Sequence, residues 1–161
     1  MFCPFVEWYL KMAAKKRSWQ EKLHDAKGHP TVAEITPAMS QRWGQGRFVI
    51  PAPIEVDELM RKVRKGQVTT IDHLRAQLAK KHEVDIACPL TTGIFAWIAA
   101  HAADEMETQG KKRITPYWRV LKKGYELNPK YPGGIENLQR RLEAEGHEVT
   151  QRGKRFFLRD P

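Results

Sequence analysis

Several features that would assign this chain to a well-known class are absent or scarce. It has only two cysteines, Cys3 and Cys88, too few for a disulfide framework or a cysteine metal cluster. Its six histidines show no metal-ligand spacing. No stretch approaches the roughly 20 apolar residues that a membrane helix needs. We therefore expect a protein of the reducing cytoplasm, with no metal, no cofactor and no membrane segment.

A secretory signal pattern is lacking as well. Residues 1–11 are apolar, but they contain Glu7, have no basic lead and carry no small-residue cleavage site. Met12 begins a segment that is more usual for a cytosolic start. We expect residues 1–11 to be an extension or an upstream start, which N-terminal sequencing of native protein would test.

What the chain does have is a large positive charge. The formal net charge is +9 and the sequence pI is about 9.7. Basic residues outnumber acidic ones by 8 to 4 in residues 1–50 and by 13 to 6 in residues 111–161, whereas residues 51–110 hold 9 acidic and 7 basic. Because Lys and Arg bind phosphates by releasing counterions, this distribution predicts a polyanionic partner. A merely soluble basic surface is the alternative.

Two short helices are predicted near the N-terminus. Ser18 and Glu21 have capping-box spacing, which predicts a helix over 19–26. A second helix begins after Thr36-Pro37 and ends at Gly44. Neither is long enough to be stable alone, so both must pack on the rest of the protein. The side chains that we expect to make this contact are Trp19, Leu23, Met39 and Trp43.

The stiff connector Pro51-Ala52-Pro53 makes residues 45–53 the best internal boundary. It divides a short helical extension, 1–52, from a main domain over 53–147. The remaining residues, 148–161, are expected to form a basic hairpin that packs on the same domain.

Three longer helices are predicted in the main domain from apolar residues at helical spacing. The first runs from Ile54 to Val63 and can end at Gly66. The second is capped by Thr70 and reaches Lys81. The third, from Leu90 to Met106, is nearly uncharged and rich in small residues. The last two are consistent with a helix-turn-helix whose turn is lengthened.

Basic turns are predicted in the last third of the chain. Lys122-Lys123-Gly124 lies between two short apolar runs, so we expect a tight hairpin there, a candidate wing. Gly133-Gly134 precedes a helix that Gly146 closes. Gln151 to Lys154 forms the turn of a second hairpin. The expected fold is mainly α with small β hairpins, a winged helix-turn-helix with a short helical N-terminal extension.

Thr115-Pro116-Tyr117-Trp118-Arg119-Val120 is the most informative segment. Read with Gly66 to Thr70 upstream and Gly133-Gly134 and Glu145-Gly146 downstream, it resembles the DNA-binding domain of the alkylguanine-DNA alkyltransferases, whose reactive center reads Pro-Cys-His-Arg-Val. The resemblance covers roughly residues 53–147. It implies that the family's nucleophilic cysteine falls on Tyr117 and its histidine on Trp118.

The resemblance also implies a DNA interface and a pocket for a flipped-out guanine. In the family a tyrosine helps to rotate the nucleotide, and it falls on Ile71 here. The arginine that fills the vacated base position falls near Thr92, and the pocket asparagine near His101. Our candidate lesion-pocket residues are Pro116, Tyr117, Trp118, Arg119 and His101.

Candidate DNA-binding residues follow from helix starts and basic turns. Small polar groups at a helix N-terminus can bind phosphate, and turn lysines can contact the DNA backbone. These candidates are Thr69, Thr70, Thr91, Thr92, Gly93, Lys122 and Lys123. The alternatives are a helix buried through Ile94, Phe95 and Trp97, and turn charges that are merely solvated.

The altered center predicts a protein without alkyl-transfer activity. Transfer needs a soft nucleophile held as its anion, and a cysteine pKa of about 8.5 is easily lowered. A tyrosine pKa is near 10, and an indole cannot accept the proton. With Tyr117 at the cysteine position, the center resembles that of the alkyltransferase-like proteins, in which an aromatic residue replaces the cysteine. Here Trp118 also replaces the histidine, which departs from that group's usual pattern. The aromatics can stack on a base or simply fill the old pocket.

Our leading hypothesis is therefore a non-enzymatic, monomeric DNA-binding protein that senses alkylated or distorted guanine in duplex DNA, with other repair proteins as further partners. A protein-interaction adaptor with a plugged pocket is the first alternative. An enzyme that uses Cys88, at a helix start where the dipole can lower a thiol pKa, is the second.

Overall fold

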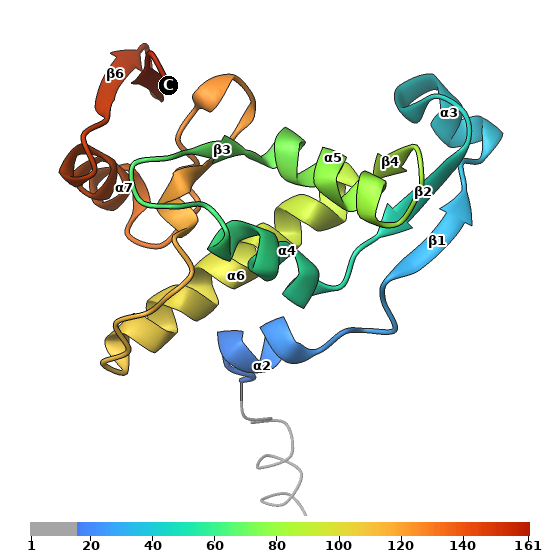
Figure 1. Ribbon diagram of the computed structural model, residues 1–161, viewed down its shortest axis with the longest axis horizontal. Coiled ribbons are helices and arrows are strands. Elements are labelled where there is room, and N and C mark those ends of the chain that lie inside the picture. Colours follow the sequence, from blue (N-terminus) through green and yellow to red (C-terminus); the bar gives the residue numbers. More distant parts are fainter. Residues whose placement is uncertain (1–15) are drawn as a thin grey trace, which may run out of the picture.

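The central element of the protein is one long helix, α6 (Pro89–Thr108), which crosses the middle of Figure 1. The computed structural model describes residues 16–161, so the predicted extension 1–11 and Cys3 lie outside the described residues. Pro89 begins α6, where the missing N–H of proline costs no hydrogen bond. Small side chains then let other helices approach closely. The alanines of α6 that are fully buried are Ala99, Ala100, Ala102 and Ala103. The predicted long helix is confirmed.

Two helices that were expected from periodicity pack against α6. These are α4 (Pro53–Arg61), which buries Val56 and Met60, and α5 (Ile71–Lys81), which buries Leu74. Thr70 caps α5 as predicted, because its hydroxyl accepts a hydrogen bond from the His73 N–H at 3.3 Å.

The two short N-terminal helices also form as predicted. In α2 (Trp19–His24) both hydrogen bonds of the Ser18–Glu21 capping box are present. The helix packs on α6 and contributes Leu23 to the core. The second, α3 (Pro37–Trp43), ends at Gly44 as expected, but no residue within it is buried.

A three-stranded sheet joins the N-terminal region to the helices. Its order is β1 (Thr31–Glu34), β2 (Arg47–Ile50) and β4 (Ile86–Ala87), with β2 antiparallel to β1 and parallel to β4. The segment 45–53, which the sequence marks as a boundary, thus contains the central strand of this sheet. β2 pairs with chain on both sides of that boundary, so the division at residue 52 stays a prediction.

The candidate wing is not a two-stranded hairpin, which corrects the sequence prediction. One 3-10 turn, η1 (Tyr117–Arg119), leads into β5 (Val120–Leu121), and β5 pairs in parallel with β3 (Thr69–Thr70). A second turn, η2 (Lys123–Tyr125), follows around Gly124 at φ +73°. The expected return strand makes only single bridges, from Glu126 to Lys122 and to Phe157. The chain after the turn therefore joins the C-terminal hairpin.

The last helix and hairpin agree with the sequence. α7 (Gly134–Ala144) buries Leu138 and Leu142, and β6 (Glu148–Arg152) pairs with β7 (Arg155–Arg159). They lie together at one end of the molecule (Figure 1).

The overall class, helices with small sheets, is confirmed, whereas the winged helix-turn-helix arrangement stays a prediction. Within residues 16–161 the longest apolar stretches of helix are too short or too polar to cross a membrane.

Candidate nucleic-acid interface

Tyr117, which the resemblance aligns with a nucleophilic cysteine, is completely buried. Its phenol oxygen accepts a hydrogen bond from the Asn137 amide on α7 at 2.9 Å. Burial raises the pKa of the phenol, despite the opposing effects of Arg141 and of the Asn137 hydrogen bond. Tyr117 is therefore neutral at ordinary pH and occupied by a protein partner, so it is neither a nucleophile nor open to a ligand.

The side chains of Trp118 and Arg119 bind the same carboxylate, that of Glu145. The Trp118 indole N–H donates to Glu145 Oε1 at 3.1 Å, and Arg119 donates to both carboxylate oxygens at 2.6 and 2.9 Å. Arg119 Nη1 also donates to the Val63 carbonyl at 2.7 Å. Burial alone would raise the pKa of Glu145, but the hydrogen bonds from Arg119 and Trp118 outweigh it and hold the pKa below its ordinary value. Glu145 therefore stays ionised and ties η1 to the end of α7.

Thr115, one residue before this group, is fixed in the same way. It is fully buried, and its hydroxyl donates to Asp57 Oδ1 at 2.5 Å. Asp57 is itself buried on α4 and accepts from Arg61 at 2.7 Å. The whole segment is thus held by polar contacts to α4, α7 and the chain that follows each of them.

These contacts correct the predicted lesion pocket. Pro116 and Tyr117 are buried, and Trp118 and Arg119 use their polar groups on Glu145, so in this conformation the four residues form a filled core. Sequence reasoning missed Asn137, whose amide is the partner of the phenol. An asparagine on a helix carries no signal of that role, because its partner lies 20 residues away in the chain.

His101 lies elsewhere, on the face of α6 that meets α2. Its ring stacks on Trp19, with centroids 4.6 Å apart, and meets the edge of Trp97 at 4.9 Å. Burial lowers the pKa of His101, which a hydrogen bond with the Lys130 backbone partly offsets. The residue lines a cleft along α6 and not the space around Tyr117.

The three DNA-contact candidates at the start of α6, Thr91, Thr92 and Gly93, differ in how far they are buried. Thr92 is fully buried, and its hydroxyl donates to the Cys88 carbonyl at 2.7 Å, so its assignment to DNA contact is wrong for this conformation. Thr91 and Gly93 are half-buried. A Cβ on Gly93 would meet no atom within 4 Å, so this position is open. Cys88 is buried at the N-cap of α6, which leaves its thiol inaccessible to a substrate.

An open cleft follows the exposed side of the first turns of α6. One part, of about 800 Å³, is lined by apolar residues of α6 and by Lys130. A smaller part, of about 260 Å³, lies between α5, α6 and β5. Both parts share Pro89, Gly93 and Asn128. The sequence-predicted positions that border this cleft are Ile71, Gly93, His101 and Lys122.

The polar rim of this cleft is mainly basic. Arg75, Lys122 and Lys130 line it, and Asp72 is the one acidic side chain among its lining residues. Asp72 accepts from Arg75 at 3.1 Å, so its charge is compensated. Sequence reasoning did not single out Arg75 or Lys130, because isolated basic residues carry no positional signal.

Lys122 has an acidic partner inside the protein. Its ammonium group lies 3.4 Å from Glu126, which also binds Arg155 of β7 through two hydrogen bonds. The Arg155 hydrogen bonds, helped by Lys122, lower the pKa of Glu126 to about 2 against the effect of burial. Lys123 has no ion pair in the described part of the chain and is exposed. The turn therefore offers one free ammonium group and one shared with Glu126.

The two remaining candidates, Thr69 and Thr70, form the short strand β3. Thr70 uses its hydroxyl oxygen to cap α5, and Thr69 lines a different pocket on the other side of that helix. The structure thus brings Lys122, Gly93 and Ile71 to one cleft, and leaves Thr69 and Tyr117 outside it.

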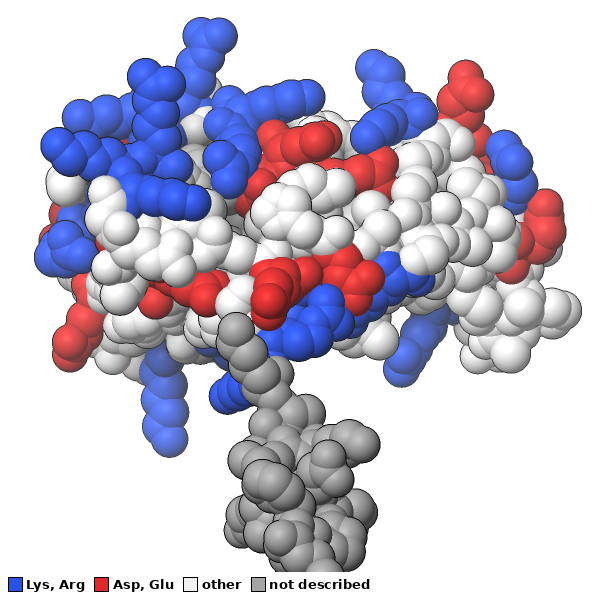
Figure 2. Space-filling model, turned by 90° about the horizontal axis from the view of Figure 1, so that it is seen from below, with Lys and Arg blue, Asp and Glu red and all other residues white. Residues whose placement is uncertain are grey.

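Positive charge is gathered at one end of the molecule. In Figure 2, Lys and Arg side chains crowd the end where α7 and the β6–β7 hairpin lie in Figure 1, and acidic side chains lie beside them toward the middle. Basic residues of α7 and the hairpin that have no ion pair among residues 16–161 are Arg140, Arg152 and Lys154. No group of three or more His, Cys, Asp or Glu residues suited to a metal occurs over the same range.

The chain was compared with family models, curated proteins and solved structures. No protein-family model matches the chain, and no curated protein matches it. Among solved structures, the crystal structure of S. pombe Atl1 in complex with damaged DNA containing O6-carboxymethylguanine is similar, with a TM-score of 0.47 and 18% sequence identity. The match covers 66% of this chain and 87% of the Atl1 chain.

Proposed function

We propose that this protein binds duplex DNA without chemically altering it. The observation that carries the proposal is the cleft along α6, which combines apolar walls with Lys122 and Lys130 at its rim. Its one acidic lining residue, Asp72, is paired with Arg75. Such a surface attracts phosphates over its rim and accepts an apolar or aromatic group between them.

The buried center supports a role without catalysis. Tyr117 is neutral and hydrogen-bonded to Asn137, and the Trp118 indole donates to Glu145 instead of accepting a proton. Cys88 is buried. Of the three, only Cys88 was a candidate nucleophile in the sequence, and its burial keeps it from a substrate.

The damage-sensing role is the finer part of the proposal. Tyr117 fills the space in which the sequence predicted a lesion pocket. A flipped or distorted base would therefore enter the smaller part of the cleft, where Ile71, Leu121 and Tyr131 offer apolar contact. Rotating a base out of the duplex costs a few kcal/mol, least for a damaged or mismatched base. We therefore propose a preference for alkylated or distorted guanine over intact duplex.

Fluorescence anisotropy of labelled duplexes with and without one alkylated guanine tests both parts. We expect the variant Lys122→Gln/Lys123→Gln/Lys130→Gln to bind both duplexes on the order of tenfold or more weakly, because each lost phosphate contact lowers affinity and salt dependence. Lys80→Gln, an exposed lysine in the last turn of α5, is the matched control. Equal affinity of the triple variant and the wild type would end the proposal.

A protein-interaction adaptor is the second candidate. One observation favours it, namely the exposure of Leu90 and Ile94 on the same face of α6, at 70% and 42%. DNA-binding proteins also expose apolar side chains, which they insert between base pairs. If the wild type binds duplex DNA tightly and Leu90→Ala does not, this face of α6 contacts DNA. Undiminished DNA binding by Leu90→Ala would leave the face to a protein partner.

A further inference from the structure

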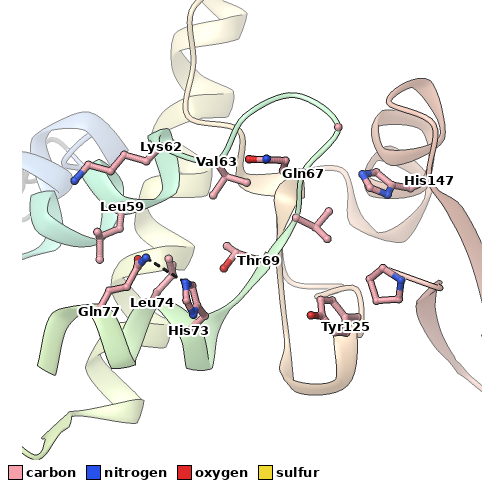
Figure 3. Close-up of a pocket in the computed structure, with 13 residues that line it drawn as sticks. Leu59, Lys62, Val63, Gln67, Thr69, His73, Leu74, Gln77, Tyr125 and His147 are labelled. Atoms are coloured by element: carbon pink, nitrogen blue, oxygen red, sulfur yellow. Dashed lines mark hydrogen bonds between the residues drawn. The ribbon is translucent and has the colours of Figure 1, made fainter. Parts of the chain in front are cut away.

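A second pocket lies on the opposite side of α5 from the cleft. It has a volume of about 450 Å³. Figure 3 shows the segment from Val63 to Thr69 arching along one edge of it, with His73 and Gln77 of α5 on one side and His147 on the other. The proposed DNA interface uses none of these residues.

The lining combines an apolar part with several polar groups. Leu59, Val63, Val68 and Leu74 supply the apolar contact. Among the described residues, no Asp or Glu side chain lines the pocket. The polar groups are instead hydroxyl, amide and imidazole, and His73 and Gln77 already meet at 3.2 Å. An anion entering this space would face these donors and no Asp or Glu side chain, and the terminal carboxylate of Pro161 is the one acidic group of the lining.

The edge of the pocket is strongly basic. Arg61, Lys62, Arg64 and Lys65 follow one another within five positions. Arg61 is paired with Asp57, but the other three are exposed and have no ion pair among residues 16–161. Lys62 also lines the pocket. Like charges held this close repel one another, and a bound anion relieves the repulsion.

His147 supplies an observation of a different kind. Its Nε2 atom is buried and is the one buried side-chain nitrogen or oxygen of the described residues without a hydrogen-bond partner. A buried polar group that is left unsatisfied is costly, and such groups in native proteins call for an explanation. His147 lines the pocket, but this nitrogen has almost no exposed surface, so a ligand group satisfies it only after the ring turns toward the pocket.

We propose that this pocket binds a nucleotide, with the phosphate at the basic edge formed by Lys62, Arg64 and Lys65 and the base against the apolar part beside His147. The volume exceeds the need of a phosphate ion and lies within the range of small-molecule sites. The nucleotide can be a free mononucleotide or the phosphorylated end of a DNA strand, since both present the same chemistry.

Histidine side-chain NMR of the full chain, titrated with dGMP, tests the proposal. We expect the ring signals of His73 and His147 to shift with dGMP and not with deoxyguanosine, which lacks the phosphate. In Lys62→Gln/Arg64→Gln/Lys65→Gln the affinity for dGMP should fall on the order of tenfold or more, because charge-assisted hydrogen bonds are lost. The variant Lys122→Gln/Lys123→Gln/Lys130→Gln should bind dGMP as the wild type does.

A short single strand with and without a 5′-phosphate identifies the source of the nucleotide. Shifts with dGMP assign the site to free nucleotides, and shifts with the phosphorylated strand alone assign it to strand ends. If neither ligand shifts His73 or His147 at millimolar concentration, or if the loop variant binds them as the wild type does, the proposal is wrong. Failure of duplex binding with dGMP binding retained would overturn the DNA interface only.

Discussion

Arg119 and Glu145 form a two-point ion pair inside the protein, with donor-to-acceptor distances of 2.6 and 2.9 Å. Their side chains are only 13% and 7% exposed. Arg119 belongs to η1, and the pair joins this turn to the end of α7. The segment 115–120, which resembles a reactive center in sequence, thus has a structural role in this fold.

We expect Arg119→Met to destabilise the protein by about 3–5 kcal/mol, because Glu145 would be left as a buried charge without its partner. Urea denaturation followed by circular dichroism measures the change. The control is Arg159→Met, which breaks an ion pair with Glu148 that is 58% and 65% exposed and should cost less than about 1 kcal/mol. Equal losses for the two variants would contradict the structural role.

Tyr117→Phe tests whether the phenol has a packing role. The variant keeps the ring and removes the oxygen that accepts from Asn137, so the Asn137 amide loses a partner. Stability should fall by about 1–2 kcal/mol. The affinity for duplex DNA should not change, since Tyr117 is buried. A tenfold loss of affinity at unchanged stability would show instead that the phenol contacts the ligand.

Stability should depend on pH through Glu126. Its pKa is lowered from 4.5 to about 2 in the folded protein, so the folded state favours the ionised carboxylate. The stabilisation is therefore fully present above about pH 4.5 and is lost as the pH falls toward 2. Thermal unfolding between these pH values should show a steeper loss for the wild type than for Glu126→Gln. Parallel curves would mean that the Arg155 hydrogen bonds contribute nothing.

Cys88 should react slowly with thiol reagents. It is 6% exposed at the N-cap of α6, so labelling requires local opening. In a Cys3→Ser background we expect iodoacetamide to modify Cys88 slowly at neutral pH and rapidly in urea. Rapid modification of the folded protein would revive the hypothesis of a catalytic thiol.

The helices could be predicted from the sequence because their signals are local. Thr70 caps α5 as expected, and Gly133 is the N-cap of α7, since a cap depends on residues a few positions apart. The strand β1 could not be predicted, because all four of its residues are exposed and show no alternation. The missing return strand after Gly124 could not be predicted, because Glu126 bridges to Phe157 and bonds to Arg155 of β7, about 30 residues downstream.

For the candidate site, too, local features could be predicted from the sequence and distant contacts could not. The segment 115–120 could be located from its resemblance, but its burial could not, because it depends on Asn137 and Glu145 from the distant α7 region. Thr92 has the chemistry of a phosphate contact, yet its position on α6 turns it toward the core. His147 and the basic run 61–65 border the same pocket only through the fold, so no pattern in the sequence connects them.

Native mass spectrometry of the protein mixed with a duplex that contains one alkylated guanine tests the central claim most directly. The account predicts a non-covalent complex whose mass is the sum of protein and intact duplex, and an unmodified polypeptide when the complex is denatured. A polypeptide heavier by the alkyl group, or the absence of any complex at low salt, would contradict it.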